Sequence, residues 1–201
     1  MTDTLRTGDI LLFTGSSYNG PLLSIFSSLI SWWTSSPYVH CAFVLKDPIF
    51  IHPSLKGIFI WESGWEFNEP DPQDSISKLG VQITPINEYL RNSPTSSVFV
   101  RRRQKGDITE KILLDIHKEV YDKPYDVNIM DWLGAAFRTS FTPKQTKRFW
   151  CSAFVSYILC RLNFIPNTTN WDLIRPSDLS STSSIIHFDK NVEYSDDERI
   201  F

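Results

Sequence analysis

The sequence predicts an α+β domain in which an antiparallel β-sheet packs against helices. Short runs of β-branched and aromatic residues, bounded by glycine, proline and other turn residues, follow one another through the first hundred residues. Two later segments repeat apolar residues at helical spacing instead. The 201 residues, of which 41% are hydrophobic and 14% aromatic, suffice for one hydrophobic core. We therefore expect a single domain over residues 1–188.

The predicted strands are short apolar runs that end at turns. Gly8-Asp9 precedes the first run, and Lys46-Asp47-Pro48 follows the second. The strands are expected at residues 10–13, 38–45 with a continuation at 49–52, 57–62, 80–84 and 97–100, with a helical turn at 86–90. Together they predict a meander of five or six strands.

The predicted helices lie mainly in the second half of the chain. Asp107 to Glu110 forms a capping-box pattern, and apolar residues then recur at helical spacing to about residue 121. The strongest helical pattern begins near Phe149, and a partial helix is expected around 130–137. We expect a last strand at 185–188 and a flexible acidic tail over residues 189–201.

Residues 21–33 form an apolar segment interrupted by four serines. The segment is too short for the ~20 residues that a membrane-spanning helix needs. As a helix, it would be apolar on most of its circumference. Two interpretations remain open: burial in the core or against a substrate groove, or contact with a membrane surface.

Charge and cysteine content exclude several classes of function. The net charge is −3 and the sequence pI about 5.8, so we expect no nucleic-acid partner. The three cysteines cannot all pair and follow no zinc-ligand spacing, and no signal peptide precedes them. We therefore expect a cytoplasmic protein with free thiols, no metal and no cofactor; the oligomeric state stays open.

Cys151 is the candidate nucleophile. It opens a predicted helix, where the amide dipoles favour a thiolate, and its backbone N–H is a natural oxyanion donor. The cationic Lys147 and Arg148 precede it, and Trp150 beside it is a candidate wall of a substrate cleft. A buried structural cysteine is the alternative interpretation, and it is the one we adopt for Cys160, nine residues further along the helix.

His40 is the candidate base because it alone among the histidines lies inside a strongly predicted strand. Strand alternation predicts that Cys41 points away from whatever His40 faces, which argues against a zinc site built on His40, Cys41 and Cys151. Glu62 ends an apolar strand and is the best carboxylate to orient the imidazole. A lone histidine in the core and a solvent-exposed glutamate are the alternatives.

Five motifs in this order resemble the circularly permuted NlpC-type papain-like superfamily, and in particular its YiiX/YaeF-type and poxvirus branch. They are Thr7-Gly-Asp-Ile-Leu-Leu-Phe13, the segment 29–44 with Ser36-Pro-Tyr-Val-His40, Trp61-Glu-Ser63, Pro124-Tyr-Asp126 and Phe149-Trp-Cys-Ser-Ala-Phe-Val155. Arg175-Pro-Ser-Asp-Leu179 is similar to a segment that follows the family's catalytic helix. The chain departs from the family at Asp122-Lys123, where relatives often carry glycine.

The resemblance implies a circularly permuted papain-like fold, with the histidine strand before the nucleophile helix. It also implies Cys151 as nucleophile, His40 as base and Glu62 as the third polar residue. The expected activity is hydrolysis or acyl transfer at an amide or ester bond of a peptide or lipid-like acyl substrate, with Trp150, Tyr38 and Trp33 as substrate-binding residues. The alternative is a catalytically silent binding protein, or a virion-structural protein, with the same fold; a viral chain would act in host cytoplasm or virion.

Overall fold

The computed structural model describes residues 2–14, 37–64, 70–92, 97–125 and 146–201. Several predictions concern residues outside these ranges: the apolar helix at 21–33, with Trp33 as a substrate-binding residue, and the partial helix around 130–137. In the described ranges, no helix combines the length and the apolar character needed to cross a bilayer.

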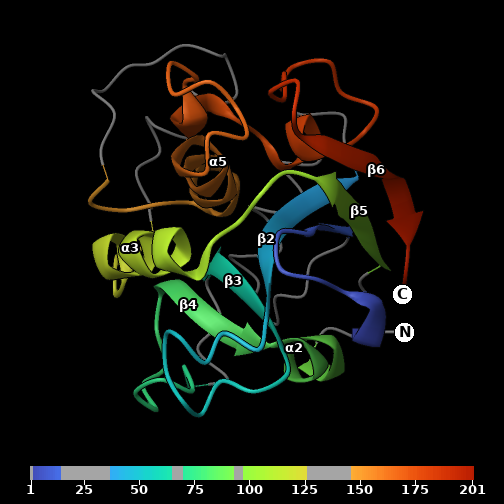
Figure 1. Ribbon diagram of the computed structural model, residues 1–201. Helices are drawn as coiled ribbons and strands as arrows, with labels where there is room; N and C mark the ends of the chain where they lie inside the picture. Colours follow the sequence, from blue (N-terminus) through green and yellow to red (C-terminus); the bar gives the residue numbers. More distant parts are fainter. Residues whose placement is uncertain (1, 15–36, 65–69, 93–96, 126–145) are drawn as a thin grey trace.

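The described part of the chain forms one six-stranded sheet, with strand order β4-β3-β2-β1-β5-β6. Every neighbouring pair is antiparallel. The strands are β1 (Ile10–Thr14), β2 (Tyr38–Lys46), β3 (Ile58–Gly64), β4 (Gly80–Pro85), β5 (Ser97–Lys105) and β6 (Glu193–Arg199). The predicted α+β class with an antiparallel sheet is therefore confirmed (Figure 1). The predicted continuation of the second strand at 49–52 is wrong, because these residues lie in a turn.

Helices cover both faces of the sheet. Helices α3 (Glu110–Val120) and α5 (Cys151–Arg161) pack on one face, where Trp61 of β3 meets Phe154 of α5 edge to face. Helix α2 (Ile86–Asn92) packs on the other face, where Tyr89 contacts Phe13 of β1. Figure 1 shows α3 and α5 close together and α2 apart from them. The described residues also include three short 3-10 helices, at Thr2–Thr4, Trp171–Leu173 and Pro176–Leu179.

The acidic segment near the end of the described chain is a strand, and the prediction of a flexible tail there is wrong. β6 pairs with β5 along the outer edge of the sheet. Tyr194 is buried and donates a hydrogen bond from its hydroxyl to the carbonyl of Gly8, 2.8 Å away. Asp197 accepts from the hydroxyls of Tyr38 and Ser180. The predicted strand at 185–188 is not present either. After α5, the first residue that pairs in the sheet is Glu193, where β6 begins.

Two close backbone contacts position the segment that leads into α5. Gly80 of β4 bridges to Pro124, and a Cβ at position 80 would lie 2.2 Å from the carbonyl oxygen of Lys123. The backbone N–H of Phe149 donates to the carbonyl of Pro124 at 3.1 Å. The turn before Pro124 places Asp122 at φ 61°, a left-handed conformation that aspartate tolerates better than most residues. The chain therefore makes this turn without the glycine that the resembling family often has there.

Candidate active site

Cys151 is the first residue of α5, as the sequence predicts, and Trp150 is its extended N-cap residue. Cys151 is buried, with 6% of its surface exposed. The hydroxyl of Ser63 donates to the carbonyl of Phe149, and the hydroxyl of Ser152 donates to that of Ile174, both at 2.6 Å. These bonds fix the start of the helix against β3 and the following loop. The first N–H groups of a helix have no partner within it, so the positive end of the α5 dipole lies at Cys151.

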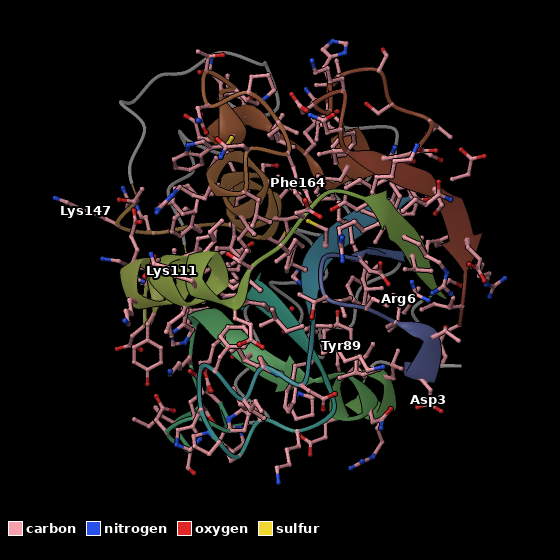
Figure 2. All side chains as sticks on the ribbon, viewed as in Figure 1. Asp3, Arg6, Tyr89, Lys111, Lys147 and Phe164 are labelled. Atoms are coloured by element: carbon pink, nitrogen blue, oxygen red, sulfur yellow. The ribbon has the colours of Figure 1, made fainter. Side chains whose placement is uncertain are left out.

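His40 lies on β2 and is 3% exposed. Its Nε2 is 2.5 Å from Oε2 of Glu62, which lies on β3 and is fully buried. The ring stacks on Tyr89 at 14° between planes and contacts Phe13, with centroids 6.3 and 5.4 Å away. Figure 2 labels Tyr89 above α2, on the side of the helix that faces the sheet. The imidazole is thus held in one orientation by a carboxylate and two aromatic rings.

Two side chains of β4 hold the other carboxylate oxygen of Glu62. Thr84 donates from Oγ1 to Oε1 at 3.2 Å, and Gln82 donates from Nε2 to the same oxygen at 3.4 Å. All three residues are buried. The register brings Glu62 opposite Gln82 directly. A buried carboxylate is costly without such donors, so these residues complete the environment of Glu62.

Strands β2 and β3 part at the site. Their ladder ends at the pair Phe43 and Trp61, although β2 continues back to Tyr38 and β3 onward to Gly64. The N–H of Val44 donates toward β1, so alternation turns the N–H of Cys41 toward the side that β3 has left. There it donates to the sulfur of Cys151. The nucleophile therefore lies in a gap between two strands.

This gap explains why both His40 and Cys41 reach the same sulfur. Cys151 makes side-chain hydrogen bonds with the His40 ring and with the Cys41 thiol. The prediction that Cys41 points away from the site is therefore wrong. Strand alternation does place the two side chains on opposite faces, with Cys41 in the α5-side core and His40 against the α2-side rings. A group inserted between the strands lies within reach of both.

The pKa values of the site favour an ion pair. The hydrogen bond from Cys41 and the charge of His40 outweigh burial and hold the pKa of Cys151 well below its usual range. Burial lowers the pKa of His40, but the Cys151 thiolate and Glu62 outweigh burial and raise it to about 10. Burial and the neighbouring thiolate raise the pKa of Cys41, which stays a neutral thiol. Near neutral pH the site thus holds a Cys151 thiolate and a His40 imidazolium.

The other residues expected at the site take varied positions. Trp150 is beside Cys151 but is largely buried in the core on the α5 side, with 8% exposure. The hydroxyl of Tyr38 donates to Asp197 at 3.0 Å, so this side chain helps to bind β6 to β2. Lys147 is exposed and extends away from the molecule (Figure 2), and it is not among the groups that lower the pKa of Cys151.

Two cavities that described residues line, of about 570 and 620 Å³, lie away from the three site residues. The first is next to Phe164 and the second next to Arg102. Neither is lined by Cys151, His40 or Glu62, so neither serves as the substrate cleft of this site.

A solved structure is similar to this chain in fold, whereas the sequence comparisons find no match. No protein-family model matches the chain, and no curated protein matches it in sequence. The crystal structure of the metalloprotein yiiX from Escherichia coli O157:H7, of the family DUF1105, aligns with a TM-score of 0.50. The alignment covers 96% of this chain and 97% of that chain, at 15% sequence identity. The two chains share a fold. At this identity the likeness does not extend to activity.

Because yiiX is a metalloprotein, the same fold in this chain calls for a test for metal ligands. Among the residues that the structure describes, no group of three or more His, Cys, Asp and Glu side chains is arranged to hold a metal ion. Around Cys151, the Nε2 of His40 is already bonded to Glu62, and Cys41 is a protonated thiol. These residues do not form a metal site as they stand.

Three residues at the site were not predicted from the sequence. Cys41 gave no signal, because the alternation rule assumes a continuous ladder. Gln82 and Thr84 did leave a signal in the sequence. They alternate with Val81 and Ile83 in a strand, which indicates a polar patch on one face. The partner of that patch, Glu62, is directly opposite in the next strand.

Proposed function

We propose that the chain is a cysteine hydrolase or acyltransferase that acts through a thioester on Cys151. The observation that carries the proposal is the buried series Cys151, His40 and Glu62, in which each group contacts the next. A thiolate beside an imidazolium whose other nitrogen is held by a carboxylate is the arrangement that activates a nucleophilic cysteine. The motifs shared with the permuted NlpC-type papain-like superfamily, and the fold shared with yiiX, support it.

In the proposed reaction, the Cys151 thiolate attacks the carbonyl carbon of an amide or ester. The backbone N–H of Cys151 donates to the developing oxyanion at the start of α5. The His40 imidazolium protonates the leaving amine or alcohol, and Glu62 keeps the ring oriented while its charge changes. Neutral His40 then takes a proton from water or another acceptor, which attacks the thioester and releases the acyl group.

The acyl donor is proposed to be a peptide or a lipid-like molecule. The apolar segment 21–33 is proposed as a surface that contacts membrane, and Trp150, Tyr38 and Trp33 as residues near the substrate. We place the protein in the cytoplasm, of a host cell if the chain is viral, with no nucleic-acid partner.

Incubation with activated acyl esters tests the proposal directly. The protein is mixed with p-nitrophenyl esters of acetate and of a long-chain fatty acid, and with a peptide library, and analysed by intact mass spectrometry. We expect an acyl adduct on Cys151 that neutral hydroxylamine removes. The adduct should be absent from Cys151→Ala and unchanged in Cys160→Ala. The wild-type Cys160 sulfur donates to the carbonyl of Pro166, so it is not part of the site.

The same samples distinguish the alternative functions. Absence of any adduct, together with equal alkylation of all three cysteines by iodoacetamide, would favour a catalytically silent binding protein. One equivalent of a transition metal in the purified wild-type protein, lost in Cys151→Ala, would replace the proposal by a metal site.

A further inference from the structure

Cys41 contacts Cys151 but takes no bond-forming step in the proposed reaction. The Cys41 thiol and the Cys41 backbone N–H both donate to the Cys151 sulfur. A sulfur that accepts from the backbone and the side chain of one residue lies close to that residue's Cβ. The two sulfurs are hydrogen-bond partners, and a disulfide would bring them to the ~2.05 Å of an S–S bond.

The surroundings of the pair limit other sulfur partners. Cys41 is fully buried and Cys151 almost so, in the core between the sheet and α5. The strands β2 and β3 do not pair beside Cys41, so its backbone is bound to β1 alone at this point. Cys160 is the other free cysteine, and it lies near the far end of α5, about 13 Å along the axis from Cys151.

The difference in ionisation between the two thiols gives each a distinct role. Cys151 is held as a thiolate, which is the form that reacts with peroxides, whereas Cys41 is held as a thiol. A thiolate oxidised to a sulfenic acid condenses with a neighbouring thiol and releases water. Cys41 is placed for this second step and cannot perform the first at neutral pH.

We infer that Cys41 is the resolving cysteine of a reversible oxidative modification of Cys151. A hydroperoxide transfers one oxygen atom to the Cys151 thiolate, which is oxidised to a sulfenic acid as the peroxide is reduced to its alcohol or to water. The Cys41 sulfur then attacks the sulfenic sulfur, its proton leaves with the hydroxyl as water, and a Cys41–Cys151 disulfide forms. An external dithiol reduces the disulfide and restores both thiols. This inference rests on the proposed function, because it requires Cys151 to be the reactive thiolate.

Peroxide treatment of the native protein tests the inference. The protein is treated with hydrogen peroxide, then quenched with catalase, alkylated under denaturing conditions and digested without reduction. We expect a cross-linked peptide joining Cys41 to Cys151 and an intact mass lower by two hydrogen atoms. Dithiothreitol should reverse both changes and restore iodoacetamide labelling of Cys151 at least tenfold.

Two variants provide the comparison. In Cys41→Ser, with folding checked by circular dichroism, peroxide should convert Cys151 to sulfinic acid, which dithiothreitol does not reverse. Cys160→Ala should behave as the wild type. Sulfinic acid on Cys151 of the wild type without a disulfide, or a disulfide to Cys160 or to a second molecule, would overturn the inference.

The failure of the inference is distinguishable from failure of the proposed function. If only the inference fails, Cys151 still acylates and alkylates rapidly but forms no bond to Cys41. If Cys151 is not a thiolate, neither peroxide nor iodoacetamide selects it in the wild type or in Cys41→Ser, and both proposals fail together.

Discussion

At the scale of single residues, the site depends on charges that stabilise one another inside the core. His40 and Cys151 are both buried, and the charge of each favours the charged form of the other. The positive imidazolium and the negative thiolate are therefore a coupled pair, and substitution of either changes the ionisation of both.

Alkylation at acidic pH tests this coupling. At pH 6, wild-type Cys151 should react with iodoacetamide at close to its rate at pH 8, because its pKa is held well below its usual range. In His40→Ala the rate at pH 6 should fall at least tenfold relative to pH 8, since an ordinary thiol with a pKa of about 8.5 is almost wholly protonated there. Peptide mass spectrometry gives the rate for each cysteine. Equal pH dependence in the two proteins would show that His40 does not stabilise the thiolate.

The pH profile of turnover tests Glu62. The His40 pKa is raised to about 10 by contacts that include Glu62, so wild-type activity should persist at neutral pH and fall as pH rises through about 10, where the imidazolium loses its proton. Glu62→Gln keeps the shape and removes the charge, so this fall should move to lower pH. Activity at neutral pH should fall about 10-fold or more, yet by less than in Cys151→Ala.

Glu110 on the surface of α3 supplies the matched control, because Glu110→Gln removes a carboxylate that is exposed and remote from His40. A wild-type profile in Glu62→Gln would leave a site of Cys151 and His40 alone.

The residue types at the site were predictable, and their contacts were only partly so. A cysteine at a helix start and a histidine in a strand are local features that sequence reveals. The contact of His40 with Glu62 followed from neighbouring strands in a meander. The place of Cys41 did not follow, because it depends on where the ladder between β2 and β3 stops, which no local pattern encodes.

At the scale of elements, β6 shows how tertiary context decides the state of a segment. Five of its seven residues are charged. Period-two alternation is weak there, and the composition is typical of a solvated tail. The segment becomes a strand because Tyr194 has a buried place beside Gly8 and because Asp197 finds hydroxyl donors in Tyr38 and Ser180.

Replacement of Tyr194 tests the contribution of β6. Tyr194→Phe removes one buried hydrogen bond and should lower the free energy of unfolding by about 1 kcal/mol. Tyr194→Ala should lower it by about 3 kcal/mol or more, since it also empties an aromatic site. Urea unfolding followed by circular dichroism measures both. Glu193→Gln, in an exposed pair with Lys105, is the control and should change stability by less than about 1 kcal/mol. Unchanged stability in Tyr194→Ala would mean that β6 is not bound in solution.

At the scale of the whole molecule, the sheet connects segments that are distant in sequence. β1 lies between β2 and β5, and β6 pairs with β5 at the edge. The helices at Cys151 and Glu110 share one core with the strands of the first half. Among the described residues, strands from the first and second halves of the chain therefore belong to the same sheet.

This topology predicts a single cooperative unfolding transition for the chain. Tryptophan fluorescence and far-ultraviolet circular dichroism should give coincident urea curves with one midpoint. Folding should be slow for a domain of this size, because the pairs β1–β5 and β5–β6 join strands that are far apart in the chain. Two separated midpoints would contradict the expectation of one domain over residues 1–188.

The central position of β1 also has a consequence during synthesis. Its partner in β5 is 83 positions further along the chain, as measured from Thr14 to Ser97. At about 5–20 residues per second, a ribosome takes roughly 4–17 s to make that interval. Throughout it, the run Ile10–Thr14 has an apolar edge with no neighbour on one side. The nascent chain therefore exposes an aggregation-prone strand edge before β5 is available to pair with it. A chaperone that binds this run during synthesis would raise the yield of folded protein.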